Sequence, residues 1–202
     1  MKYTGPKVRL SRRLGIAITA KAAEVMEKRP YGPGQHGPAK QFRRGRQSAY
    51  ERQLLEKQRL RAQYNIHEKQ MTNYYKKAVR KEGNTSDILI QLLESRLDAF
   101  VLRAGFANTI YSARQVVSHG HFLINGKRVN IASYQLSPGD RVAVRPKSQN
   151  MAMFEQWLAS AAPPDYVTTD KKGMVAQYLY LPRRSEVPII CEVPQVIEYY
   201  SR

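Results

Sequence analysis

The chain has 202 residues, of which 42% are hydrophobic, which suffices for one or two domains with their own cores. Its 34 Lys and Arg residues against 16 Asp and Glu give a net charge of +18, and such an excess indicates a polyanionic partner. Cys191 is the only cysteine, which excludes an internal disulfide and a multi-thiolate metal site and suits a reducing cytoplasm. No apolar run reaches the roughly eighteen residues of a membrane-spanning helix, and the N-terminus lacks the apolar stretch of a signal peptide.

The positive charge is concentrated in the first half of the chain. Residues 1–85 hold 21 basic and 6 acidic residues, a net of +15, whereas residues 86–202 hold 13 and 10, a net of +3. This unevenness favours a polyanion-binding N-terminal region over a surface that charge merely keeps in solution. The first 23 residues carry no acid, a pattern that an organellar transit peptide would share.

Residues 1–47 are rich in Lys, Arg, Gly and Pro and show little helical periodicity. Such a segment cannot bury enough apolar surface to order itself, so we predict an extended basic arm that orders on a phosphate backbone. Its arginines would neutralise phosphates and release counterions; they include Arg9, Arg12, Arg13, Arg43, Arg44 and Arg46. A basic tail without a defined site is the alternative.

A capping-box pattern at residues 48–51 (SAYE) predicts a helix that runs to about residue 64. Arg52 and Arg59 are seven residues apart and share one face, while Lys57 and Arg61 are four apart and share another. Cations on two sides favour a helix wedged against RNA, and a plain solvated helix is the alternative.

The next helix is expected over residues 67–83, with four apolar or aromatic residues packing inward: Met71, Tyr74, Tyr75 and Val79. A further helical pattern leads into residue 94 and beyond, with apolar residues at steps of three and four: Leu89, Leu93, Leu97, Phe100 and Ala104. Gly105 fits the left-handed cap that ends it. Residues 48–93 therefore form a basic helical domain joined directly, without a flexible linker, to the segment that begins at residue 94.

Residues 94–145 combine two helices with a hairpin. In the second helix, over SARQVVSHG, Ala113, Val116 and Val117 form the apolar face. Arg114 and Gln115 are therefore expected to point outward, which leaves a basic residue available for a ligand.

The dipeptide Asn125-Gly126 is a strong hairpin signal, because a type I′ turn needs positive φ at both central positions. Pairing across this turn puts Arg128 on the outer face and Lys127 at the hairpin end. The inner face is expected to hold Phe122, Ile124, Val129 and Ile131. Another strand, residues 141–145, follows the turn at residues 138–140.

Beyond residue 145, Trp157 and Leu158 are expected in the core, and residues 174–182 and 187–193 as strands or extended segments. Residues 194–202 predict a short C-terminal helix whose apolar side needs a partner. The N-terminal helices are the obvious candidate, which would make the hairpin region an insertion within the helical domain.

No phosphate loop, nucleophile elbow or zinc-protease motif occurs. His119 and His121 are the nearest approach to a metal pair, but without a neighbouring carboxylate or thiol cluster an RNA contact or a turn is the better interpretation. Asp98 and Asp140 are isolated, not the paired carboxylates that acid–base catalysis needs. We therefore expect no enzyme, no metal and no cofactor.

The segments SRLDAFVLRAGF, SARQVVSHGHFLINGKRVNI and SPGDRVAVR closely resemble a small αα-then-β RNA-binding module, of the alpha-L type. The module is named after bacterial small-subunit ribosomal protein number four and also occurs in pseudouridine synthases and tyrosyl-tRNA synthetases. With YTGPKVRLSRRLG, YGPGQHGPAK, SAYERQLLEKQRLRAQYNIHEKQ and IEYYSR added, the resemblance to that ribosomal protein family covers nearly the whole chain. Because it begins at residue 3, we expect no cleavable transit peptide.

The resemblance implies an α+β fold in four parts: a basic arm (1–47), a helical rRNA-binding domain (48–93), the RNA-binding module (94–157) and a C-terminal segment packing back on the helical domain (158–202). It implies a structural constituent of the cytoplasmic small ribosomal subunit. That protein would be a primary binder of the 5′ domain of 16S rRNA that nucleates assembly of the 30S body. It would contribute to translational accuracy with ribosomal proteins five and twelve, without being an obligate homo-oligomer.

Carried over to this sequence, the family motifs place a set of basic and polar residues on rRNA: Arg9, Arg12, Arg13, His36, Tyr50, Arg52, Lys57, Arg61, Arg114, Gln115, His119, Lys127 and Arg128. Several relatives hold zinc through four cysteines in the N-terminal arm; none stands here, so no zinc is expected. Two alternatives remain open: an RNA-modifying enzyme of the pseudouridine-synthase kind, for which the 57 residues after Arg145 are too few, and a non-specific nucleic-acid-compacting protein.

Overall fold

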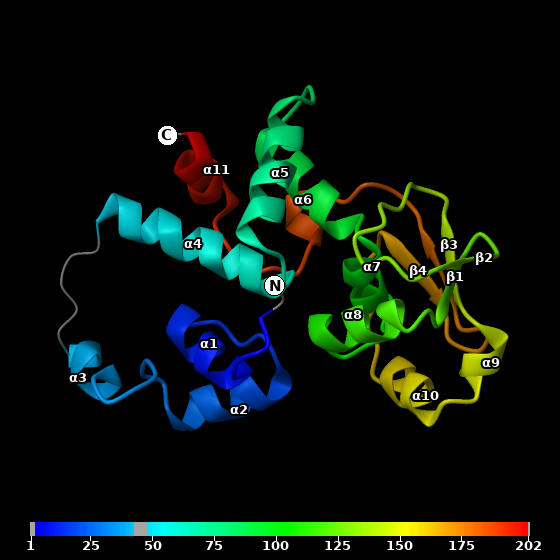
Figure 1. Ribbon diagram of the computed structural model, residues 1–202, viewed down its shortest axis with the longest axis horizontal. Coiled ribbons are helices and arrows are strands. Elements are labelled where there is room, and N and C mark those ends of the chain that lie inside the picture. Colours follow the sequence, from blue (N-terminus) through cyan, green and yellow to red (C-terminus); the bar gives the residue numbers. More distant parts are fainter. Residues whose placement is uncertain (1–2, 43–47, 202) are drawn as a thin grey trace. The chain divides into compact units, whose positions relative to one another are not determined.

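The computed structural model describes residues 3–42 and 48–201, which fold into two compact units. The first, the helical unit, joins residues 1–76 to residues 189–202; the second, the sheet unit, comprises residues 77–188. The chain thus leaves the helical unit, forms the sheet unit and returns, which is the insertion expected from the sequence (Figure 1). The boundaries of these two units differ from those of the four segments that the resemblance suggests. The four-segment division stays a prediction.

The described elements of the helical unit are α1 (Lys7–Leu14), α2 (Ala20–Lys28), α3 (Gly37–Phe42), α4 (Ala49–Gln63), most of α5 (Glu68–Val79) and α11 (Val193–Ser201). Three of these helices lie where an extended arm was expected, so that expectation is wrong for residues 7–42. The physical reason for α1 and α2 is a small core: Leu14, Ile16 and Ala22 are buried. Gly15, at φ 68°, ends α1 in the left-handed conformation and lets the chain turn into α2.

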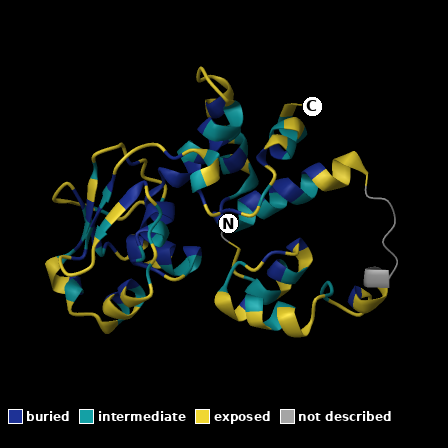
Figure 2. Cartoon of the chain, turned by 180° about the vertical axis from the view of Figure 1, so that it is seen from behind, coloured by how far each residue is buried: buried dark blue, intermediate teal, exposed yellow. Residues whose placement is uncertain are grey.

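The long helix α4 begins as its sequence predicts, because the Ser48 side chain accepts a hydrogen bond from the backbone N–H of Glu51 at 3.1 Å. The N-terminal end of α4, at residues 48–52, is exposed to solvent (Figure 2). Along α5, Met71 and Ala78 are fully buried while Val79 is 54% exposed. The expected inward position of Val79 is therefore wrong, because the buried stripe passes through its neighbour.

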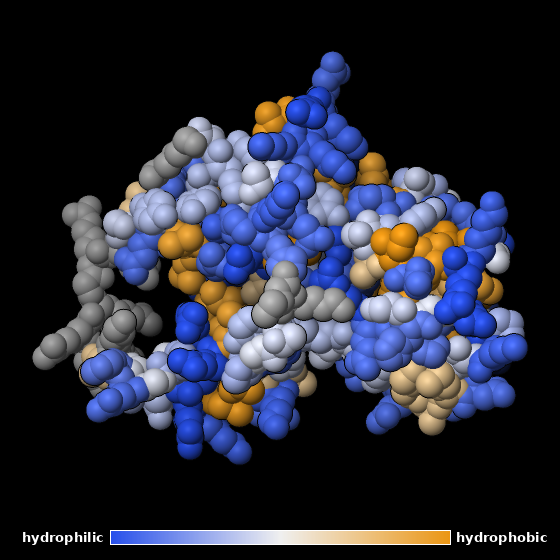
Figure 3. All heavy atoms as spheres, viewed as in Figure 1, coloured by the Kyte–Doolittle hydropathy of each residue, from blue (hydrophilic) through white to orange (hydrophobic). Residues whose placement is uncertain are grey.

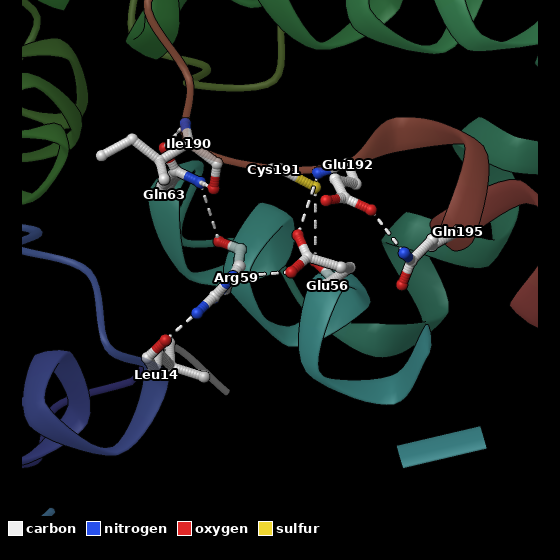
Figure 4. A network of polar contacts seen from close by, with 8 residues as sticks. All are labelled: Leu14, Glu56, Arg59, Gln63, Ile190, Cys191, Glu192 and Gln195. Carbon is white, nitrogen blue, oxygen red and sulfur yellow. Dashed lines mark hydrogen bonds and ion pairs between the residues drawn. The ribbon is translucent and has the colours of Figure 1, made fainter. Parts of the chain in front are cut away.

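The C-terminal helix α11 packs against α4, the partner that its apolar residues require. Polar contacts fix the chain just before it (Figure 4). Gln63 donates to the Ile190 carbonyl at 3.1 Å and accepts from the Ile190 N–H at 3.0 Å, and the Glu56 carboxylate accepts from the Glu192 N–H at 2.9 Å. Two side chains of α4 therefore hold the segment that leads into α11 against α4.

The described elements of the sheet unit are α6 (Thr85–Glu94), α7 (Leu97–Arg103), α8 (Ile110–Ser118), β1 (Phe122–Ile124), β2 (Lys127–Val129), β3 (Arg141–Val144), α9 (Pro146–Gln149), α10 (Ala152–Ala159), β4 (Val167–Asp170), β5 (Val175–Tyr178) and a 3₁₀ turn, η1 (Arg184–Glu186). The strands form one antiparallel sheet in the order β2-β1-β3-β5-β4. The α+β class expected from the sequence is confirmed.

The hairpin register is also confirmed: Phe122 pairs with Val129, and the turn residues Asn125 and Gly126 have φ of 48° and 82°. Ile131, however, is 57% exposed, so its predicted place on the inner face is wrong. The strand β2 ends at Val129, and residues 131–134 form a turn in which the Tyr134 N–H donates to the Ile131 carbonyl. Alternation no longer applies once the strand has ended.

The single helix expected around residues 89–104 is two helices, α6 and α7. Between them the backbone bonds to a loop instead of to itself: the Leu136 N–H donates to the Ser95 carbonyl at 2.7 Å, and the Leu97 N–H donates to the Tyr134 carbonyl at 2.9 Å. Gly105, at φ 82°, follows α7 as expected. Among the described residues, no helix has both the length and the apolar character needed to cross a membrane.

Candidate RNA-binding surface

On α1 the three predicted arginines divide into two kinds. Arg9 and Arg13 are exposed and lie four residues apart, so they share one helix face. Arg12 donates to the carbonyls of Tyr31 and Gly32, both at 3.1 Å, and its guanidinium lies 5.0 Å from the Tyr31 ring centre. Arg12 therefore ties the loop after α2 to α1, while its two neighbours present charge to solvent.

Among the other predicted residues of the N-terminal segment, His36 is exposed in the turn before α3. Arg43, Arg44 and Arg46 lie outside the described residues. In α4, Tyr50 is 51% exposed and packs 5.8 Å from the Tyr199 ring, and Arg52 is exposed.

The other cations of α4 bind within the unit. Arg59 donates to the Leu14 carbonyl at 2.9 Å and pairs with Glu56 at 2.6 Å (Figure 4). Lys57 is 4% exposed, and its ammonium lies 4.3 Å from the Tyr199 ring centre. These side chains hold α1, α4 and α11 together, so their predicted RNA contacts remain predictions that the packing does not favour.

Glu68, at the start of α5, is the hub of this packing. Its carboxylate lies 3.0 Å from Lys57 Nζ and 3.2 Å from an Arg61 guanidinium nitrogen, and it accepts from Tyr200 Oη at 2.7 Å. Partial burial opposes its charge, but the Tyr200 hydrogen bond and the charges of Lys57 and Arg61 outweigh burial and lower the pKa of Glu68. Burial, and after it the same hydrogen bond, raise the pKa of Tyr200. Glu68 thereby joins α4, α5 and the C-terminal helix.

In the sheet unit, Arg114 does not point outward as expected: it is 8% exposed, and its Nε lies 3.8 Å from the Asp98 carboxylate. Asp98 is itself fully buried and forms a bidentate pair with Arg96 at 2.8 and 3.0 Å. A buried carboxylate is stable only with cationic or hydrogen-bonding partners. Its attraction for the Arg114 guanidinium therefore favours the inward orientation of that side chain. Its neighbours Gln115 and His119 are exposed, as predicted.

The hairpin carries two of the exposed cations of this unit. Lys127 and Arg128 are both exposed. The Arg128 guanidinium lies over Gly120, since a Cβ placed there would be 2.5 Å from Nη2 and 2.6 Å from Nε. Arg145 approaches the same residue and donates to the Gly120 carbonyl at 3.2 Å. On the face drawn in Figure 3, hydrophilic side chains adjoin a hydrophobic area over the strands.

Comparison with known proteins agrees with this arrangement of a basic helical part followed by a helix–hairpin module. The family model described as "Ribosomal protein S4/S9 N-terminal domain" matches residues 2–94, and the one described as "S4 domain" matches residues 95–142. The small ribosomal subunit protein uS4 of Micrococcus luteus is 50% identical over 201 residues, covering 96% of this chain and 95% of the relative. That of Chlorobium phaeovibrioides is 48% identical over 204 residues, covering 100% and 99%. The chain belongs to the uS4 family.

The S4-domain match ends at residue 142, yet the sheet of this uS4 chain continues beyond it. β5 pairs with β3 and β4 pairs with β5, so residues 167–178 widen the sheet of the module. Tyr178, on β5, is fully buried, and burial raises its pKa to about 12. The segment after the module is therefore part of its sheet unit.

Sequence reasoning left two residues out of the candidate site that the structure brings to it, His121 and Arg145. His121 was considered only together with His119, as a metal pair, an RNA contact or a turn, and Arg145 only as the last residue of a strand. Both lie at Gly120, where the end of α8 meets the sheet. Two signals in the sequence could have found them. One is the HGH tripeptide directly after a helix, and the other is an arginine at the end of a strand expected to pair nearby.

Proposed function

We propose that this uS4 chain is a structural constituent of the small ribosomal subunit and a primary binder of 16S rRNA. Its site would be a multi-helix junction in the 5′ domain, where binding nucleates assembly of the 30S body. The observation that carries the proposal is the exposure of cations on two separate supports, α1 and the β1–β2 hairpin. RNA helices are recognised mainly through shape, phosphates and 2′-hydroxyls, which suits broad cationic surfaces better than a pocket.

The proposed RNA-contacting set consists of the exposed members of the predicted residues: Arg9, Arg13, His36, Tyr50, Arg52, Gln115, His119, Lys127 and Arg128. Arg43, Arg44 and Arg46 are added to it from the sequence alone. The relatives carry the name of a small ribosomal subunit protein, which supports the same partner for this chain. The proposal also includes a contribution to decoding accuracy, together with ribosomal proteins five and twelve, in the cytoplasmic ribosome. This part rests on the family resemblance.

A salt titration of binding to the 5′ domain of 16S rRNA tests the proposal, with duplex DNA and an unrelated structured RNA as competitors. If roughly ten phosphates are contacted, affinity should fall with about the seventh to ninth power of the salt concentration. Binding that survives both competitors supports a shape-specific primary binder. Binding lost equally to any polyanion would leave a non-specific nucleic-acid-compacting protein.

The enzyme alternative is tested by turnover. Residues 146–188 supply α9, α10, β4, β5 and η1, and two of these elements are strands of the same sheet as the hairpin. This use of the segment supports a structural role over a separate catalytic domain. Formation of pseudouridine in the rRNA by the purified chain would overturn it.

A further inference from the structure

Four groups that carry or can acquire positive charge surround Gly120, at the junction of α8 with the sheet. His119 and His121 flank it in sequence, with ring centres 6.0 Å apart. The Arg128 guanidinium lies over its Cα, and Arg145 donates to its carbonyl at 3.2 Å. Gly120 has φ 73°, a conformation that suits glycine, and the missing side chain lets Arg128 approach.

This cluster has two possible roles. The carbonyl end of a helix attracts cations, so the four groups could simply complement the C-terminus of α8. Such a role accounts for Arg145 on the Gly120 carbonyl, but that bond uses one of the five N–H donors of a guanidinium. It does not account for four such groups gathered at one glycine, since like charges repel one another and favour an anion between them.

His121 is the most enclosed of the imidazoles in this cluster. Its Nδ1 lies 2.9 Å from Ser148 Oγ on α9, and its ring packs edge-on against Phe154 on α10, 6.1 Å between centres. Burial lowers the pKa of His121, and the charges of His119 on the α8 side, Arg145 after β3 and Arg128 on β2 lower it further. These effects favour the neutral imidazole, although the cations beside it suit the site to an anion.

We propose that His119, His121, Arg128 and Arg145 form a binding site for a backbone phosphate of RNA, and that His121 takes up a proton when the phosphate binds. The inference rests on the proposed RNA-binding function. Ser148 fixes the ring at Nδ1 and leaves Nε2 to donate to a phosphate oxygen once the ring is protonated. The arginines supply the permanent charge, and the histidines make its strength depend on pH.

The sign of the pH dependence follows from the two states of His121. In the free protein its pKa lies below the ordinary 6.5, whereas a bound phosphate raises it. Between these two values binding takes up a proton, so affinity rises as pH falls and levels off below the free-state pKa. An anion within hydrogen-bonding reach shifts a pKa by about one unit or more, so affinity should rise about tenfold from about pH 8 to about pH 5.5.

The test measures binding of the full chain to 16S 5′-domain RNA across this pH range at constant ionic strength. We compare the wild type with His121→Gln and with His67→Gln, a control in the helical unit. His121→Gln should lose most of the gain in affinity between about pH 8 and about pH 5.5, whereas His67→Gln should keep it. Calorimetry in two buffers of different ionisation enthalpy should show proton uptake by wild type that His121→Gln lacks.

Several outcomes would overturn the inference. Equal pH dependence in wild type and His121→Gln would show that this imidazole is not linked to binding. Affinity lost equally at every pH, together with a lower melting temperature, would make His121 a structural residue of the α8 end. If wild type fails to bind the RNA selectively at any pH, the proposed function itself falls, a result separate from bound RNA with no proton linkage.

Discussion

Helix α4 and the β1–β2 hairpin both carry cations that the sequence assigned to RNA, but they use them differently. In α4, Lys57 and Arg61 bind Glu68, and Arg59 binds Glu56 and a carbonyl of α1. On the hairpin, Lys127 and Arg128 are exposed. A helix in the middle of a bundle has carboxylates and carbonyls within reach, whereas a short hairpin at a sheet edge has few. The number of cations on an element therefore does not measure how much charge it offers to a ligand.

The largest effect is expected at Lys57, the most buried cation of α4. Lys57→Ala removes a buried side chain that packs on Tyr199 and also pairs with Glu68, and should cost about 2–3 kcal/mol of unfolding free energy, mostly through lost packing. Denaturant unfolding without RNA measures this. Arg52→Ala, on the same helix but exposed, is the control and should stay within about 0.5 kcal/mol of wild type. Equal stability of the two variants would show that packing does not hold Lys57 more firmly than the exposed Arg52. The contrast between the paired cations of α4 and the exposed cations of the hairpin would then fall.

Arg114 extends the contrast into the sheet unit. Arg114→Ala should lower the unfolding free energy by about 1–2 kcal/mol, because Asp98 stays buried with one cation fewer, although Arg96 still pairs with it. Gln115→Ala, at the next position and exposed, should leave stability unchanged. A melting temperature that matches wild type, with weaker RNA binding, would restore Arg114 to the RNA surface.

The difference between these residues explains what the sequence could predict. Local signals were sufficient for the Ser48 cap and for the Asn125-Gly126 hairpin, because each is set by a few neighbouring residues. The direction of Arg114 depends on Asp98 in another helix, and the partners of Lys57 and Arg61 come from α5 and α11. Such long-range pairs have no signature in helical periodicity.

The N-terminal segment shows the same limit. Its Gly, Pro and Arg content predicted an extended arm, because composition records how little apolar surface is available. The helices α1 and α2 depend on a few buried residues, Leu14, Ile16 and Ala22, and on Arg12 tying down the loop at Tyr31. Of the candidate site, the exposed cations were predicted, whereas the cluster at Gly120 was not, because it forms only when α8, β2 and β3 meet.

A smaller effect is expected on the hairpin, and in affinity instead of stability. Lys127→Ala should weaken binding to the 5′-domain RNA by about three- to tenfold and reduce the salt slope by about one, the loss of one phosphate contact. Its melting temperature should not change, because Lys127 is exposed. Lys172→Ala removes an exposed lysine from the turn between β4 and β5 and should change neither affinity nor slope. Identical salt slopes for the two variants would show that the hairpin contributes only general charge.

The smallest effect concerns Glu68, the hub that occupies the cations of α4. Its pKa is lowered from 4.5 in the folded protein, so its contribution to stability is present above that value and is lost as pH falls through the lower, folded pKa. Glu68→Gln should therefore be less stable than wild type at neutral pH, by less than about 1 kcal/mol because the side chain is 43% exposed and its charge is screened.

Unfolding measured for both proteins from about pH 7 to about pH 3 tests this, and the difference between them should disappear in the acid range. Glu155→Gln, an exposed carboxylate of α10, is the matched control and should follow wild type at every pH. A difference between wild type and Glu68→Gln that persists unchanged below the folded pKa would mean that packing and hydrogen-bond geometry at Tyr200, and not the carboxylate charge, join α11 to α4 and α5.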